Sequence, residues 1–376
     1  MVKVCHMTSA HPRYDTRIFQ KECTSLAGNG YEVYLVVNDG LDSENKDGVN
    51  IVSTGYVPKN RKDRMKNGTK AVYETAVKLD ADIYHFHDPE LLPKGLKLKN
   101  MGKKVIFDSH EIYYYQIQYK YYIPVFLRKL IANCYKYYER NVVSKIDAVI
   151  VPSTLRGENF FKDVAKKTTL INNVPKKSSI QKVDYKEKSL PISCCMLGSL
   201  SISRGLKETL VASKNTDVKL ILAGDDSKLS GEGKTFFYKQ LKENKLLEYW
   251  GYVDRNKVNE IYQESHIGIS LLYNLGQYNL SDNLPTKVYE YMLAGIPVVV
   301  SKQRYSEEFF NKYPAGILVD VENQKEIDDA ICYLRDHPKE AAEMGELGHK
   351  IVSEKYCWEE ESKKLLDLYL DLSGES

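Results

Sequence analysis

The sequence predicts a two-domain α/β protein in which each domain is a doubly wound unit built on a parallel sheet. Short apolar runs alternate with segments of helical periodicity along the whole chain. Most of these runs are continuously apolar, which is typical of parallel strands covered on both faces. A length of 376 residues exceeds what one hydrophobic core usually organises, so we expect two domains.

Apolar runs in both halves of the chain are expected to form the strands of two sheets. These runs are Lys3–Met7, Glu32–Val37, Ile83–His87, Lys104–Asp108, Ala148–Pro152, Ile192–Leu197, Lys219–Ala223, Ile267–Leu271, Ile296–Val300 and Ala315–Val319. Residues 176–191 interrupt the alternation of apolar runs and helical segments because they are polar and aperiodic, and we interpret them as a linker. The predicted domains are therefore residues 1–176 and 190–356, followed by a C-terminal segment, 357–376, whose helix carries an apolar stripe that must dock.

Composition limits the functional class and the compartment. The chain is 43% hydrophobic and 28% charged, which describes a globular protein, and its net charge of +3 does not indicate a nucleic-acid partner. The seven cysteines show no metal-binding spacing and no disulfide framework, so we expect a cytoplasmic protein. No apolar run reaches the length of a membrane span, and the N-terminus reads as a strand and not as a signal peptide.

The most informative segment, residues 281–301, reads as a polar loop, a helix, a glycine stop and a buried strand. Asp282 and Asn283 are good N-cap residues, and Pro285 suits the first turn of a helix. A helix N-terminus can hold a diphosphate, and the carboxylates of Asp282 and Glu290 could accept hydrogen bonds from sugar hydroxyls. The alternative is a surface loop capping an ordinary helix, which is the commoner meaning of such a segment taken alone.

Polar clusters follow several of the predicted strands. Because ligands of open parallel sheets bind outside the carboxyl ends of strands, these clusters are candidate site residues, and two sheets facing one cleft would account for them. The clusters are residues 9–17, 85–90, 108–111, 198–205 and 282–287.

Two of these clusters contain residues suited to phosphate or substrate contact. Arg204 and Gly205 follow a strand and open a helix, where the guanidinium can grip a diphosphate; the alternative is a surface arginine in a turn. His110 lies in a polar loop at a strand end, where functional residues concentrate. His87, next to Asp88, could equally form a structural pair, so we favour substrate contact for His110 more than for His87.

Residues 125–138 carry apolar side chains at helical spacing beside basic ones, within a tyrosine-rich stretch. Such a helix could meet a membrane surface or a lipid-linked acceptor. The commoner alternative is a core-facing helix with a solvated basic face.

In this order, the motifs of the chain resemble the family 4 glycosyltransferases of the GT-B fold, particularly bacterial capsule and surface-polysaccharide enzymes. The resemblance covers nearly the whole chain. It rests on residues 6–19, 82–92, 105–111, Ile171–Pro175, Gly251–Val253, 282–290 and Tyr356–Trp358. It implies that the C-terminal helix crosses back to the N-terminal domain, which would bind the acceptor while the second domain binds the nucleotide sugar.

The resemblance also implies roles for the two carboxylates. The family has two glutamates with seven residues between them, whereas this chain has Asp282 first and Glu290 second. By similarity, Asp282 would contact the transferred sugar and Glu290 the ribose, and the shorter Asp282 makes the sugar contact the less secure one. His110 matches the family's histidine close to the donor.

Two further departures from the family affect the phosphate and acceptor sites. Ser199 stands where many relatives have an arginine, so neutralisation of the diphosphate would fall to Arg204, Lys287 and backbone N–H groups. The first loop lacks the family's pair of glycines and offers Arg13 and Arg17. The expected donor-binding residues are Gly198, Asn283, Leu284, Pro285, Thr286, Lys287 and Glu290. The expected catalytic residues are His110, Asp282 and Arg204. The expected acceptor or cleft residues are Arg13, Asp15, Arg17 and His87.

The implied activity is retaining transfer of a sugar from a nucleotide-sugar donor to a glycan or polyprenyl-linked acceptor, without a metal or another cofactor. The enzyme would act in bacterial surface-polysaccharide synthesis, in the cytoplasm or peripherally on the inner face of the membrane. Two alternatives stay open, since fold alone does not exclude them: a nucleotide-sugar epimerase, and a non-catalytic nucleotide-sugar-binding scaffold.

Overall fold

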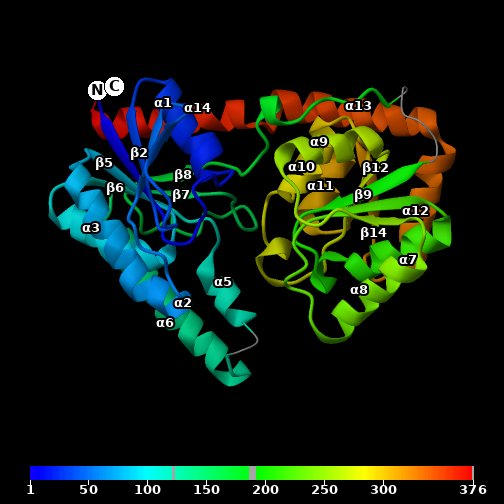
Figure 1. Cartoon of the computed structure of the whole chain (residues 1–376), viewed down its shortest axis with the longest axis horizontal. Coiled ribbons are helices and arrows are strands. Elements are labelled where there is room, and N and C mark those ends of the chain that lie inside the picture. The colour runs from blue at the N-terminus through cyan, green and yellow to red at the C-terminus, as the bar shows by residue number, and fades with distance from the viewer. Residues whose placement is uncertain (121–122, 186–191, 375–376) are drawn as a thin grey trace. The chain divides into compact units, whose positions relative to one another are not determined.

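The computed structural model describes residues 1–120, 123–185 and 192–374 (Figure 1). The chain divides into two compact units, of which the first comprises Met1–Asn173 with Glu361–Ser376 and the second comprises Val174–Glu360. Each unit is a sheet with helices on both faces, so the predicted α/β class is confirmed. The last helix, α14 (Trp358–Ser373), belongs to the first unit from Glu361 onward, as the crossing helix requires.

The first unit contains an eight-stranded sheet in the order β3-β4-β2-β1-β5-β6-β7-β8. Its neighbouring strands are parallel except for the β3–β4 pair. The strands are β1 (Lys3–Met7), β2 (Glu32–Val37), β3 (Glu44–Lys46), β4 (Val49–Ser53), β5 (Ile83–Phe86), β6 (Lys104–Asp108), β7 (Ala148–Val151) and β8 (Thr168–Leu170). The order reverses between β1 and β5, where doubly wound sheets open a crevice for ligands.

Helices of the first unit follow its strands and bury their apolar faces against them. Leu365, Leu368 and Tyr369 of α14 are buried, which confirms the docking expected of the apolar stripe. The helical segments before α14 are η1 (Ile18–Cys23), α1 (Thr24–Gly28), α2 (Arg61–Asp63), η2 (Arg64–Gly68), α3 (Thr69–Leu79), η3 (Pro89–Leu91), α4 (Leu92–Asn100), α5 (Tyr113–Gln118) and α6 (Val125–Val143).

The second unit contains a six-stranded sheet in the order β11-β10-β9-β12-β13-β14, whose paired strands are all parallel. This is the strand order of a dinucleotide-binding sheet, with its reversal between β9 and β12. The strands are β9 (Ser193–Leu197), β10 (Lys219–Ala223), β11 (Leu247–Tyr249), β12 (Ile267–Ser270), β13 (Val298–Ser301) and β14 (Gly316–Val319).

Helices of the second unit alternate with these strands in sequence. They are η4 (Lys177–Ser179), η6 (Ile202–Arg204), α7 (Leu206–Thr216), α8 (Gly231–Glu243), α9 (Arg255–Glu264), η7 (Gly276–Asn279), α10 (Thr286–Leu293), α11 (Arg304–Lys312), α12 (Gln324–Asp336), α13 (Pro338–Lys355) and the start of α14.

Two features of the chain differ from the sequence-based expectation. The short strands β3, β4, β8 and β11 were not expected, because each is too brief or too polar to stand out as an apolar run. The expected linker is partly structured, since Ile180 and Val183 pack in the core of the second unit and the Val183 amide donates to the Ala294 carbonyl at 2.9 Å. Residues 186–191 of that linker lie outside the described residues.

Candidate functional site

The carboxyl ends of β1, β5 and β6 carry the polar residues of the first unit. His6 and His85 are paired in register on β1 and β5, His87 follows β5, and Asp108 ends β6. These strands flank the point where the strand order reverses, so the tertiary structure concentrates the polar clusters where a ligand crevice is expected.

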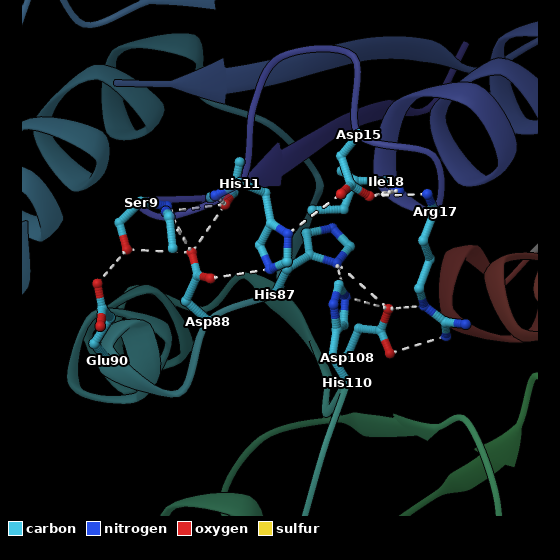
Figure 2. Close-up of polar contacts among 12 residues, drawn as sticks. Ser9, His11, Asp15, Arg17, Ile18, His87, Asp88, Glu90, Asp108 and His110 are labelled. Carbon is cyan, nitrogen blue, oxygen red and sulfur yellow. Dashed lines mark hydrogen bonds and ion pairs between the residues drawn. The ribbon is translucent and has the colours of Figure 1, made fainter. Parts of the chain in front are cut away.

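The Asp88 carboxylate fixes the loop that follows β1. Its Oδ2 accepts hydrogen bonds from Thr8 Oγ1 at 2.9 Å and from the amide of Ser9 at 2.6 Å (Figure 2). Ser9 Oγ also donates to Glu90 Oε1 at 2.8 Å, and Arg64 pairs with the same Glu90 carboxylate. The residues after β5 therefore hold the first loop in one shape.

Arg13 and Arg17, which we expected to line an acceptor cleft, are both buried in ion pairs. Arg13 Nε lies 2.6 Å from Asp39 Oδ2, and its Nη1 pairs with Glu44. Arg17 donates from Nε to Asp108 Oδ2 at 2.7 Å and from Nη2 to Asp108 Oδ1 at 3.0 Å. Carboxylates therefore engage both guanidinium groups, and an acceptor contact of Arg13 or Arg17 stays a prediction.

Asp15 caps the turn that opens η1 and pairs with His11. Its Oδ1 accepts hydrogen bonds from the amides of Arg17 at 2.8 Å and Ile18 at 2.9 Å, and its Oδ2 lies 3.3 Å from His11 Nδ1. Burial opposes ionisation of Asp15, but the His11 and backbone hydrogen bonds outweigh it and lower the pKa of Asp15. Burial likewise opposes the charged ring of His11, yet Asp15 and the charge of Asp88 raise the pKa of His11. An acceptor contact of Asp15 stays a prediction.

His110 and His87 converge on the Asp108 carboxylate. His110 Nε2 lies 3.1 Å and His87 Nδ1 lies 3.4 Å from Asp108 Oδ2, and the two ring nitrogens are 3.2 Å apart (Figure 2). The His110 side chain is 19% exposed, whereas His87 and Asp108 are buried. Burial lowers the pKa of His87 to about 4, so His87 is neutral at physiological pH. His110 is thus the member of this trio that can reach a ligand.

Among the residues of the first unit that the structure describes, two groups have ligand atoms close enough together to hold a metal ion. One comprises His6, Glu22, His85 and His87, and the other comprises His87, Asp108 and His110. The expectation that the protein works without a metal is not tested by this geometry and stays a prediction.

In the second unit, Gly198 and Gly224 let the ends of β9 and β10 approach each other. Both have positive φ, and a Cβ on Gly224 would lie 1.7 Å from the Gly198 carbonyl oxygen. A Cβ on Gly198 would lie 3.9 Å from Cε of Lys287, so the lysine reaches over this glycine. The structure therefore brings together two of the expected donor-binding residues.

The helix of the 281–301 segment begins later than we expected. Its N-cap is Pro285 and its first residue is Thr286, so neither Asp282 nor Asn283 caps it. Asn283 Oδ1 instead accepts a hydrogen bond from the Tyr289 hydroxyl at 2.7 Å. Since Pro285 offers no side-chain oxygen, the first amides of α10 receive no cap from that side chain.

Glu290 is buried on α10 and bound by three side chains. Its Oε1 accepts from Arg255 Nη2 at 2.9 Å, and its Oε2 accepts from Lys287 Nζ at 2.6 Å and from the Tyr262 hydroxyl at 2.9 Å. Burial disfavours the carboxylate, but the charges of Lys287 and Arg255 outweigh that cost and lower the pKa of Glu290. Glu290 is therefore a buried, ionised carboxylate that three side chains hold in place.

Asp282 and Arg204, the other expected catalytic residues of this unit, lie in loops near strand ends. Asp282 forms an ion pair with Arg304 at the start of α11. Arg204 ends the 3₁₀ turn η6 after β9, and the positive φ of Gly205 then starts α7. A Cβ on Gly205 would lie 2.4 Å from Leu271 Cβ, so only glycine fits this close approach. Leu284 is buried, and Thr286 is the first residue of α10.

Sequence reasoning missed several residues that these sites use. Arg255 and Tyr262 of α9 hold Glu290, while His6, Glu22 and Tyr369 lie behind His87. Arg255 follows the Gly251–Val253 motif closely, which was the available signal. His6 begins the 6–19 motif but was not singled out within it. The other three had no signal, because each is a single residue in a helical stretch.

Comparison with protein families assigns both halves of the chain. Residues 17–173 match Glycosyltransferase Family 4, and residues 180–351 match Glycosyl transferases group 1. With two dinucleotide-binding-type units and these matches, the chain belongs to the family 4 glycosyltransferases of the GT-B fold. No curated protein matches the chain in sequence.

Solved structures share the fold over the full length. A sucrose-phosphate synthase from Thermosynechococcus elongatus is 16% identical, with 100% of both chains covered and a TM-score of 0.77. Anabaena HepE (Alr3699), solved with UDP and glucose, is 12% identical, with 99% of this chain and 100% of that chain covered and a TM-score of 0.70. A glycosyltransferase from Rickettsia africae is 15% identical, with 100% and 99% covered and a TM-score of 0.70.

Proposed function

We propose that the protein is a retaining, metal-independent glycosyltransferase that moves a hexose from a nucleotide-sugar donor to a glycan or polyprenyl-linked acceptor. We place it in bacterial surface-polysaccharide synthesis, in the cytoplasm or on the inner face of the membrane. The observation that carries the proposal is the buried, ionised Glu290 on α10, held by Lys287 and Arg255 beside the glycine turn at Gly198.

The second unit is the proposed donor site. An ionised carboxylate accepts hydrogen bonds from vicinal hydroxyls, which suits Glu290 to a ribose. The first amides of α10, together with Lys287 and Arg204, supply the positive potential that a diphosphate needs. Asp282 is assigned to the transferred sugar, and solved HepE complexes with UDP-glucose make a uridine nucleotide the first donor to test.

In the reaction we propose, the bond between the anomeric carbon and the diphosphate oxygen breaks as the acceptor oxygen bonds to that carbon on the same face. The acceptor proton passes to the departing diphosphate. Lys287, Arg204 and the backbone amides stabilise the charge that develops on that diphosphate. By the family resemblance, we assign His110 to the donor sugar.

The acceptor side of the proposal includes a membrane contact through α6. Its exposed apolar residues include Phe126, at 81% exposure, with Leu130 and Tyr137 on the same helical face. Lys136 and Arg140 line an adjacent groove of about 420 Å³. Apolar side chains beside cations suit a surface of anionic lipid. None of the described helices is apolar and long enough to cross a bilayer.

Donor binding is tested by thermal shift and calorimetry with UDP, GDP, ADP and their sugars, because a bound ligand stabilises by mass action. We expect one nucleoside diphosphate to raise the melting temperature. Arg204→Ala should weaken binding of that diphosphate by about tenfold and leave the free nucleoside unaffected. Lys207→Ala, on the exposed side of α7, is the control. Equal losses for nucleoside and diphosphate would contradict the phosphate role of Arg204.

Product analysis separates transfer from the two alternatives. With donor and a lipid-linked acceptor, a transferase forms a glycoside of retained anomeric configuration. An epimerase converts the donor without acceptor, and a scaffold binds donor without turnover. Either of those results would refute the proposed reaction while leaving the donor site in place.

The membrane contact is tested by sedimentation with phosphatidylglycerol vesicles and with neutral vesicles. Phe126→Asp should abolish sedimentation with anionic vesicles, because it places a charge on the exposed stripe. Tyr252→Asp, at an exposed site of the second unit, should not. Equal binding of both variants would remove α6 from the contact.

A further inference from the structure

Behind His110, five side chains form an uninterrupted chain of polar contacts inside the first unit. Asp108 Oδ2 lies 3.4 Å from His87 Nδ1, and His87 Nε2 lies 3.0 Å from His6 Nδ1. His6 Nε2 lies 3.3 Å from the Tyr369 hydroxyl oxygen, which lies 2.8 Å from His85 Nδ1. All five residues are buried, so water does not compete for these contacts.

The hydrogen bonds in this chain of contacts must all point the same way, from donor to acceptor. A neutral imidazole has one N–H donor and one bare nitrogen, so the role of one ring nitrogen fixes the role of the other. Burial lowers the pKa of His6, His85 and His87, which keeps the three rings neutral. It follows that the three buried histidines must share the same tautomer.

Asp108 selects which tautomer that is. Arg17 contacts both of its carboxylate oxygens, at 2.7 and 3.0 Å, and an ionised carboxylate can only accept hydrogen bonds. A bare His87 Nδ1 would direct its lone pair at this anion from 3.4 Å, whereas an N–H there is attracted to it. The proton of each buried histidine therefore belongs on Nδ1.

Glu22 lies at the far end of the chain of contacts. Its Oε2 is 4.0 Å from His85 Nε2, which is beyond hydrogen-bonding distance, and its Oε1 is 3.1 Å from Arg17 Nε. Burial and then the charge of Asp108 raise the pKa of Glu22, whereas the charge of Arg17 lowers it. The direction of the relay is therefore set by Asp108 and not by Glu22.

We infer that this relay is polarised from His85 to Asp108 and orients His110 so that an N–H on its Nε2 points at the Asp108 carboxylate. His110 Nε2 lies 3.1 Å from Asp108 Oδ2, where only an N–H is compatible with the carboxylate. Tyr369 is a positioning residue in this scheme, because its hydroxyl joins His6 to His85 from the C-terminal helix.

The relay determines which ring nitrogen of His110 can meet a substrate. Its Nε2 is held 3.1 Å from Asp108 Oδ2, so Nδ1 is the nitrogen with which His110 would contact a substrate. This consequence rests on the proposed function, whereas the tautomers of the buried histidines do not.

The tautomers can be measured directly in the full chain labelled with [¹⁵N]histidine, by two-bond ¹H–¹⁵N correlation near pH 7.5 after dialysis against EDTA. We expect Nδ1–H for His6, His85 and His87, and Nε2–H for His110. A different tautomer at any of these four, or averaging among the buried three, would overturn the relay. A stoichiometric metal whose removal changes the spectrum would overturn it too, in favour of a metal site.

Tyr369→Phe cuts the relay while keeping the ring. It leaves His6 Nε2 without its donor and His85 Nδ1–H without its acceptor, so we expect averaged tautomers at both. Tyr84→Phe is the matched control, because Tyr84 is buried in the same unit and its hydroxyl bonds only backbone groups of Ala81 and Ala76 in the contacts described. If Tyr369→Phe folds and its histidine spectra are unchanged, the positioning role of Tyr369 is refuted. If the variant does not fold, the tautomers in the wild-type spectrum still test the relay.

The spectra also separate this inference from the proposed function. They need no substrate, so an absence of transferase activity in the wild type would refute the function and leave the tautomer result standing. Conversely, an active transferase with a mixed set of tautomers would refute the relay alone.

Discussion

Replacing Glu290 by Gln tests the ion-pair network at the centre of the proposed donor site. The variant keeps the shape of the side chain but loses the charge that pairs with Arg255 at 2.9 Å and Lys287 at 2.6 Å. Charge-assisted hydrogen bonds contribute about 1.5–3 kcal/mol each. The two cations are 31% and 28% exposed, which weakens both pairs, and the amide oxygen still accepts one bond. We therefore expect a loss of about 2–3 kcal/mol, or roughly 5–10 °C in melting temperature.

The assay is thermal unfolding of the wild type, Glu290→Gln and a surface control, Glu260→Gln, whose pair with Lys257 is half exposed. The control should change stability by less than about 1 kcal/mol. Because the pKa of Glu290 is lowered in the folded protein, its contribution is present above its ordinary pKa of 4.5 and is lost as pH falls. The gap between wild type and variant should therefore narrow below that pH. An unchanged melting temperature at pH 7.5 would refute the network.

Two further predictions concern backbone fit and pH. Gly224→Ala should prevent stable folding of the second unit, because its Cβ would lie 1.7 Å from the Gly198 carbonyl oxygen. Circular dichroism measures this loss of structure. The control Gly251→Ala should remain folded, because Gly251 also has a positive φ but its Cβ would meet open space. Glu139 is buried and its Oε1 accepts a hydrogen bond from the Tyr135 hydroxyl at 3.1 Å, and burial raises its pKa from 4.5 to about 7. Its stabilisation is thus full below pH 4.5 and lost as pH rises through 7. Glu139→Gln should remove up to about 3 kcal/mol of this pH dependence, and parallel pH–stability curves for variant and wild type would contradict the assignment.

Much of the donor side could be singled out from local sequence, because each of its residues lies in a recognisable strand-end or helix-start segment. Gly198, Lys287 and Glu290 occupy a strand end and one turn of a helix, and the structure brings Lys287 against both of the others. The helix start was misplaced by a few residues, since Asn283 bonds Tyr289 in place of capping the helix. Cap identity depends on side-chain rotamers that sequence does not reveal.

The first-unit site was less predictable, because its partners come from distant segments. Arg13 and Arg17 were expected as acceptor or cleft residues, and the structure buries them against Asp39 and Asp108, carboxylates that are distant from them in sequence. His110 and His87 were singled out from their loops, whereas His6 and Tyr369 were not. Tyr369 read as one more apolar position on an amphipathic helix, and only its docking places the hydroxyl between two histidines.

The sequence by itself determined the α/β class, the two sheets and the family, because the periodicity of apolar residues and short motifs at strand ends are local properties of the chain. Only the tertiary structure decided how charge and protons are arranged at the sites. Parallel strands bring together residues far apart in sequence, and burial then requires each ionised or hydrogen-bonding group to find a partner that no local pattern specifies.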